Sequence, residues 1–189
     1  MTFNEGIRID TSTTSSGGGM GGRGLAVGGG VGGLVVVLIA LFFGIDPGSV
    51  TGGQTAQQPG AATPGFDVSQ CKTGKDANDN VNCRVIATGN SVDQVWSQLL
   101  KGYSRPKLHL FTESTNTACG AATSDVGPFY CPADRTVYID TSFYQVLQDR
   151  FGSSGGPLAQ EYVIAHEYGH HVQNLLGDIS KAQNGVQGA

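Results

Sequence analysis

The chain lacks any cluster of basic residues. Among its 189 residues, Lys and Arg number 11 and Asp and Glu number 15, which gives a formal net charge of −4 at pH 7. A protein that binds nucleic acid presents a basic patch to the phosphates, because those contacts supply much of the affinity. We therefore do not expect nucleic acid as a partner. The length of the chain allows one domain of ordinary size with appendages.

Apolar residues are scarce at the start of the chain. Residues 1–24 are largely Ser, Thr and Gly, and the 30 glycines of the protein are concentrated in its early part. This composition predicts a disordered N-terminal tail over residues 1–24. The glycines are not typical of a phosphate-binding loop, since no strand precedes them and no Gly-Lys-Ser or Gly-Lys-Thr follows.

Charge is absent from Leu25–Ile45. At 1.5 Å per residue this segment can cross a hydrocarbon core of about 30 Å, so it predicts a transmembrane helix. A cleaved signal peptide is the alternative, but the long polar stretch before the segment and the lack of a small-x-small cleavage site favour an uncleaved anchor. Arg8 and Arg23 precede it, and no Lys or Arg occurs between Asp46 and Cys71. The prediction is a single-pass membrane protein with a cytoplasmic N-terminus and an extracytoplasmic C-terminal domain.

A globular domain is expected over residues 67–189. Residues 46–66, which precede it, are rich in Pro, Gly, Gln, Thr and Ala and predict a flexible linker. Ser91 is a candidate N-cap of a short amphipathic helix that Gly102 ends.

Two stretches of this domain alternate as strands do, Lys107–Thr112 and Thr136–Asp140. A helix is expected over Phe143–Phe151, and another over Ala159–Gly177. The mixture of strands and helices predicts an α+β fold.

The chain has only four cysteines, Cys71, Cys83, Cys119 and Cys131, and none are spaced C-x₂₋₄-C. That spacing is typical of structural zinc sites, so a four-cysteine zinc site is disfavoured. An even count in a domain placed outside the membrane predicts two disulfides. Local pairing of the first two and the last two closes two short loops, while two other connectivities remain formally possible.

Three of the four histidines lie close together, in His166-Glu167-Tyr168-Gly169-His170-His171. On a helix, positions i and i+4 lie on one face, so His166 and His170 can bind one metal ion while Glu167 acts as a general base. An amphipathic helix with surface histidines is the alternative. The apolar surroundings argue against it, because two buried imidazoles beside a buried carboxylate are costly without a partner. His171 points about 100° away and is not expected to be a ligand.

The stretch Ala118–Gly177 contains GPFYCPADRTVYID and YVIAHEYGHHVQNLLG. With these motifs, and with a glycine-rich N-terminus, one apolar segment and a linker before the domain, the chain resembles the bacterial putative neutral zinc metallopeptidase family. The resemblance implies a zincin-like domain, a Zn²⁺ cofactor, hydrolysis of a peptide or protein substrate, and a single membrane anchor. It also implies that an edge strand binds substrate by strand addition, for which Thr136–Asp140 is the candidate.

A third zinc ligand is missing from the motif's downstream region. Catalytic zinc takes three protein ligands and a water, and family members are expected to supply the third from a downstream Glu. No Glu follows Glu167, and Asp178 is the only carboxylate among the later residues. We therefore expect the third ligand downstream of Ala189, in a longer form of the chain, with Asp178 as a weak candidate.

The missing ligand leaves two other functions open. One is a membrane-tethered binding or scaffold protein that retains the metal helix without catalysis. The other is a non-peptidase hydrolase that uses the same zinc chemistry. A third ligand in a longer chain would separate catalysis from the scaffold role.

Overall fold

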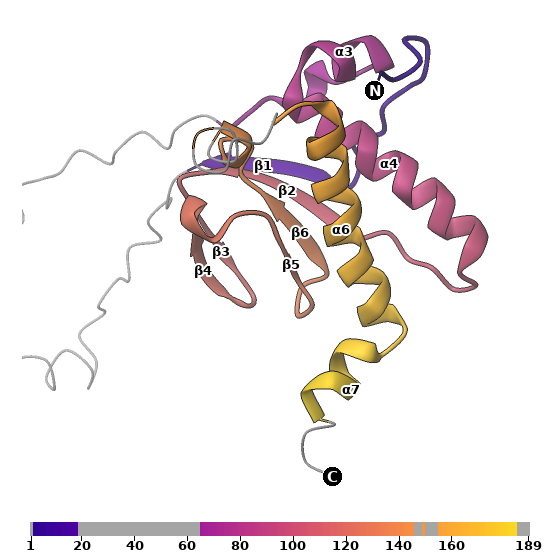
Figure 1. The fold of residues 1–189 in the computed structure, drawn as a ribbon, viewed down its shortest axis with the longest axis vertical. Helices are drawn as coiled ribbons and strands as arrows, with labels where there is room; N and C mark the ends of the chain where they lie inside the picture. The colour runs from indigo at the N-terminus through magenta and orange to yellow at the C-terminus, as the bar shows by residue number, and fades with distance from the viewer. Residues whose placement is uncertain (1, 19–64, 146–148, 150–154, 185–189) are drawn as a thin grey trace, which may run out of the picture. The chain divides into compact units, whose positions relative to one another are not determined.

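The computed structural model describes residues 2–18, 65–145, 149 and 155–184. Over these residues the protein is α+β with two small sheets (Figure 1). The strands are β1 (Thr14–Gly18), β2 (Lys107–Thr112), β3 (Ser114–Thr117), β4 (Gly120–Thr123), β5 (Phe129–Cys131) and β6 (Thr136–Ile139). The helices are α3 (Gly74–Asp79), α4 (Val81–Leu99), α6 (Pro157–Leu175) and α7 (Asp178–Asn184), with 3-10 turns η1 (Val68–Gln70) and η2 (Ser124–Val126).

The larger sheet has the strand order β1-β2-β6-β5, and β3 pairs with β4 in the smaller one. β1, β2 and β6 run parallel, whereas β5 is antiparallel to β6. Leu108 pairs with Val137 and Leu110 with Ile139, so four buried side chains share one face of the sheet. β2 and β6 thereby confirm the two strands that alternation predicts.

The N-terminal tail predicted to be disordered contains an ordered strand. β1 pairs with β2 along its whole length and is the indigo arrow in Figure 1. Before β1, the N–H of Phe3 donates to Oδ1 of Asn78 at 2.7 Å, and Ile9 packs against the core. Composition is a poor guide here because a strand rich in Ser and Gly can still join a sheet through backbone hydrogen bonds. The predicted tail over residues 1–24 is therefore wrong for residues 14–18.

The prediction of a transmembrane helix and a single-pass protein needs correction. In the part of the chain that the structure describes, no helix is long and apolar enough to cross a bilayer. The predicted segment Leu25–Ile45 itself lies outside the described residues, as does nearly all of the predicted linker. The hydroxyl of Ser16 donates to the carbonyl of Phe66. The N-terminal strand and the domain thus pack together, whereas the predicted topology would put them on opposite sides of a membrane.

The helix predicted to start at Ser91 starts earlier and is longer. Asn80 N-caps α4, its Oδ1 accepting from the N–H of Asn82 at 2.8 Å. Ser91 lies inside the helix and donates its hydroxyl to the carbonyl of Ala87. The first half of α4 is buried almost all round, so it lacks the one-sided apolar stripe that marks the second half.

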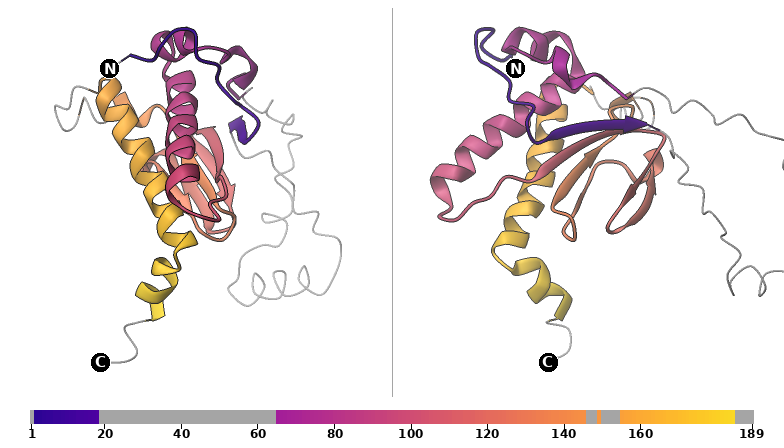
Figure 2. Two further views of the ribbon diagram at one scale, coloured as in Figure 1. Left: turned by 90° about the vertical axis from the view of Figure 1, so that its right-hand side faces the viewer. Right: turned by 180° about the vertical axis from the view of Figure 1, so that it is seen from behind.

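Helices α4 and α6 pack against each other beside the sheet, as the two further views in Figure 2 show. Their contact surfaces belong to one buried cluster with β2 and β6, which includes Val85, Ile86, Leu108, Val137, Ile164 and Tyr168. A helix held on this many sides has a fixed position relative to the sheet. That position determines where the His-Glu-x-x-His residues lie.

Two disulfides cross-link the domain, and they join the first two cysteines and the last two cysteines. Cys71 bonds to Cys83 and so ties the segment before α3 to the first turn of α4. Cys119 bonds to Cys131 and ties the turn between β3 and β4 to the end of β5. The four cysteines are therefore structural, and the four-cysteine zinc site is excluded.

Candidate metal and catalytic site

The His-Glu-x-x-His motif lies on α6, a helix of 19 residues. Pro157 occupies the start, where its missing N–H breaks no hydrogen bond. Gly177 follows the end with a φ of 78°, a conformation that glycine adopts without strain, and so terminates the helix. One side of the helix is anchored by a stripe of buried apolar residues, Ile164, Tyr168 and Val172.

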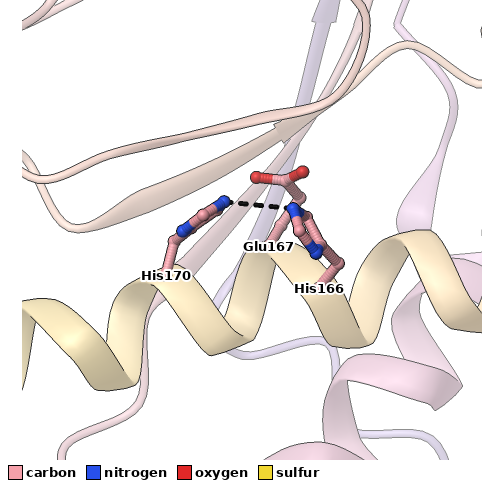
Figure 3. A group of neighbouring side chains, drawn as sticks. All are labelled: His166, Glu167 and His170. Carbon is pink, nitrogen blue, oxygen red and sulfur yellow. Dashed lines mark hydrogen bonds between the residues drawn. The ribbon is translucent and has the colours of Figure 1, made fainter.

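His166, Glu167 and His170 come together in a group suited to bind a metal (Figure 3). One ligand atom from each lies within 4.8 Å of the others. Nε2 of His170 lies 3.1 Å from Nε2 of His166, and the two rings meet edge to face with centroids 4.7 Å apart. The helical spacing thus brings both imidazoles to one face, with the Glu167 carboxylate beside them.

The two imidazoles fit a zinc ion. With Zn–N bonds of 2.0–2.1 Å and a tetrahedral angle, two coordinating nitrogens lie about 3.3 Å apart, close to the 3.1 Å observed. Nδ1 of His170 lies 2.9 Å from Oε1 of Gln173. Because an amide oxygen only accepts, Nδ1 must carry the proton, which leaves the lone pair of Nε2 available for a metal.

The carboxylate is more buried than the imidazoles. Glu167 is 7% exposed, whereas His170 is half-buried and His166 is exposed. The expectation that both imidazoles are buried is therefore wrong. The geometry of the donor atoms, and not the cost of burying the imidazoles, supports a metal site here. The open side at His166 leaves the group accessible to a substrate.

Burial raises the pKa of the Glu167 carboxyl, because removing the charged form from water is unfavourable. The imidazoles of His170 and His166 and the backbone N–H of Tyr130 oppose this rise in pKa. A carboxylate with a raised pKa is a better proton acceptor at neutral pH.

Among the described strands, β5, and not β6, forms the edge of the sheet next to α6. β6 lies between β2 and β5, so the prediction that Thr136–Asp140 is a substrate-binding edge strand is wrong. In an antiparallel pair, alternate residues direct their N–H and C=O toward the partner and away from it. The backbone N–H of Tyr130, in the middle of β5, lowers the pKa of the Glu167 carboxyl and therefore lies close to the candidate site.

His171 lies behind the site and does not join the metal-binding group, as its helical position predicts. Its Nε2 donates to the carbonyl of Ser104 at 2.7 Å, and its Nδ1 lies 3.0 Å from the hydroxyl of Tyr130. That hydroxyl in turn accepts from Nδ2 of Asn174 at 2.9 Å. Burial lowers the pKa of His171 and so favours the neutral ring that this pattern requires. The network ties β5 to α6, which the sequence does not reveal because Tyr130 and His171 are far apart in the chain.

The remaining predicted residues lie apart from the cluster. Asp178 begins α7 and pairs with Lys181 at 3.2 Å, and it is not in the group of three. No other His, Cys, Asp or Glu joins that group among the described residues. A Cβ at Gly169 would meet no described atom within 4 Å, so close packing does not explain that glycine.

Comparison with known proteins gives a consistent family assignment. The sequence profile described as "Putative neutral zinc metallopeptidase" matches residues 4–189. An uncharacterised protein of Mycobacterium tuberculosis is 62% identical over all of this chain, which covers 64% of that protein. The uncharacterised protein YpfJ of Escherichia coli is 41% identical over 95% of this chain, which covers 62% of it. The chain thus spans less than two thirds of the length of these curated relatives. No solved structure shows significant similarity to it.

Proposed function

Since the chain belongs to the putative neutral zinc metallopeptidase family, we propose that it forms the metal-binding part of a zinc-dependent peptidase. The observation that carries the proposal is the group on α6, where two Nε2 atoms lie 3.1 Å apart beside a buried carboxylate. His166 and His170 would hold the metal, and Glu167 would act as the general base.

Bound zinc would act as a Lewis acid that polarises the substrate carbonyl and makes water more acidic. The residues of the chain have separate tasks around it. Glu167 orients a water molecule, accepts its proton as the peptide carbonyl is attacked, and returns that proton to the leaving amine. The backbone N–H of Tyr130 favours the charged form of Glu167. Gln173 holds the His170 ring with Nε2 directed toward His166.

The proposal requires a third protein ligand. Catalytic zinc sites use three protein donors and leave one position for water or substrate. The described residues bring only two histidines and the general base together. The relatives are longer than this chain, and we propose that the third donor lies in a segment that corresponds to their additional length; a protein with that segment is called full-length below.

Zinc content and peptide cleavage, measured together on the full-length protein, test the proposal. Glu167→Gln should keep zinc and lose cleavage, because it removes the base but no metal ligand. His166→Ala should lose both. His109→Gln is the matched control: it changes a histidine of β2 outside the group and should keep both. A Glu167→Gln protein that cleaves peptides at the wild-type rate would rule out this mechanism.

A non-catalytic metal-binding role is the second candidate. The absence of a third donor from the described part of the group favours it. In that case the full-length protein binds zinc through His166 and His170 but cleaves neither peptides nor esters. Cleavage of esters alone would instead indicate a non-peptidase hydrolase.

A further inference from the structure

A cavity of about 200 Å³ lies directly beside His166 and Glu167. Three of its lining residues come from the loop that leads into β5, one follows β6, and two lie on α6 one turn before the motif. They are Val126, Gly127, Pro128, Phe143, Tyr162 and Val163. None of these six is an acidic or basic residue, and apart from the hydroxyl of Tyr162 their side chains are apolar.

The wall of this cavity is held in place by the fold. Gly127 has a φ of 75°, and a Cβ there would lie 3.2 Å from the ring of Phe143. The N–H of Gly127 donates to the carbonyl of Ser124 at 3.2 Å. Val163 and Phe143 also pack against the main core cluster. The loop and the ring therefore face each other closely.

We propose that this cavity binds one apolar side chain of a peptide substrate, next to the bond that is cleaved, and so selects residues of the size of Leu or Phe. The proposal rests on the proposed peptidase function. A volume of about 200 Å³ is below the roughly 300–1,000 Å³ of pockets that take drug-sized ligands, and it suits a single side chain.

Charge decides which side chains the cavity excludes. A Lys or Arg would lose its hydration against a mostly apolar wall, which is unfavourable. An Asp or Glu would meet that cost and also the negative charge of Glu167. Glycine and Ala would enter but would leave the cavity partly unfilled.

Cleavage of peptides that differ at one residue tests the proposal on the full-length protein. At one of the two positions flanking the cleaved bond, Leu or Phe should be preferred over Ala by at least about tenfold in kcat/KM, the usual effect of filling an apolar pocket. Val126 is 59% exposed at the rim, so Val126→Asp should fold, lower that preference and raise cleavage beside Lys. Val95→Asp is the matched control, because Val95 is 52% exposed on α4 and does not line the cavity.

Two results would overturn the proposal. One is equal cleavage beside Leu, Ala and Lys, and the other is an equal effect of Val126→Asp and Val95→Asp. Val163→Ala supplies a second variant, which should enlarge the cavity and shift the preference from Leu toward Phe.

Binding without cleavage separates this proposal from the peptidase function. In Glu167→Gln, NMR titration should show N-acetyl-leucinamide binding at least about tenfold more tightly than N-acetyl-lysinamide. If no peptide is cleaved but this difference in binding holds, the peptidase function fails and the apolar cavity stands. If both amides bind equally weakly, the cavity does not select apolar side chains.

Discussion

Gly89 on α4 leaves the space that the Tyr168 side chain of α6 occupies. A Cβ atom at Gly89 would lie 2.4 Å from Oη and 3.0 Å from Cζ of Tyr168. Tyr168 is 2% exposed and stands between Glu167 and His170 in the chain. The close approach of the two helices at this point therefore fixes the position of the residues that form the candidate metal site.

We expect Gly89→Ala to displace α6 and to destabilise the protein. An added methyl group in a well-packed interface costs typically about 1–3 kcal/mol. Because the shortest contact is to the tyrosine hydroxyl, Tyr168→Phe in the same chain should recover part of the loss. Urea denaturation of the two single variants and the double variant measures this coupling. Additive effects of the two substitutions would contradict the proposed contact.

Sequence patterns predict the elements whose signals are local. Alternation identifies β2, and the cysteine spacing suggests the pairing that is observed. The sequence pattern does not predict β1, because this strand has almost no apolar side chains and is stabilised by hydrogen bonds to a strand far away in the sequence. The start of α4 is not predicted for a related reason: the first half of this helix is buried by tertiary contacts and lacks an amphipathic pattern.

Removing residues 2–18 should destabilise the domain. The deletion exposes the backbone edge of β2, and it removes Ile9 from the core and Asp10 from Arg105. We expect a lower urea midpoint and faster hydrogen exchange of the β2 amides than in the intact chain. Ile9→Ser should cost more stability than Ile7→Ser, because Ile9 packs on the core whereas Ile7 is exposed. Unchanged exchange in β2 would show that β1 does not protect it.

Asp10 should contribute to stability only above its folded-state pKa. Hydrogen bonds from Ser12 and then from Arg105 lower that pKa from 3.8 to about 2. A lowered folded-state pKa means that the unfolded chain takes up the proton first, so the contribution is complete above pH 4 and is lost as the pH falls toward 2. The Asp10 side chain is 51% exposed, so solvent screening should keep the effect below about 1 kcal/mol.

The matching experiment compares Asp10→Asn with the wild type at pH 6 and at pH 2. The difference in unfolding free energy between the two proteins should be present at pH 6 and absent at pH 2. It should also shrink at high salt, because the pair with Arg105 is partly exposed. The same difference at both pH values would contradict the role of the charge.

Gly169→Ala should stabilise α6. Glycine inside a helix costs about 1 kcal/mol relative to Ala, and no described atom lies near the position of the new methyl group. Thermal unfolding should show a higher midpoint for the variant. If Gly169→Ala raises the thermal midpoint of this chain but lowers that of the full-length protein, the added methyl group must clash with a further segment. That segment would then pack against the face of α6 on which Gly169 lies.

At the candidate site, the i, i+4 spacing correctly predicts that His166 and His170 share a face with Glu167 beside them. The contacts of these residues are not predictable in the same way. Which strand runs beside α6 depends on the pairing of β5 with β6, and the three residues of β5 are too few to carry a clear pattern. The nearness of the Tyr130 N–H to Glu167 and the hydrogen bond between Tyr130 and His171 follow from that placement.

Tyr130→Phe should lower kcat for peptide cleavage, and by more than a control substitution that also destabilises the fold. The substitution leaves Nδ1 of buried His171 without its donor and Nδ2 of Asn174 without its acceptor, at a cost of about 1–3 kcal/mol. It also frees β5 to move relative to α6, so the backbone N–H of residue 130 is less well placed beside the Glu167 carboxylate. Tyr138→Phe is the matched control, because its hydroxyl donates to Asp134 at 2.8 Å, away from α6. Both variants should lose stability, both should keep zinc, and only Tyr130→Phe should lower kcat for peptide cleavage. Equal kcat values for the two variants would show that the Tyr130 hydroxyl stabilises the fold without positioning the base.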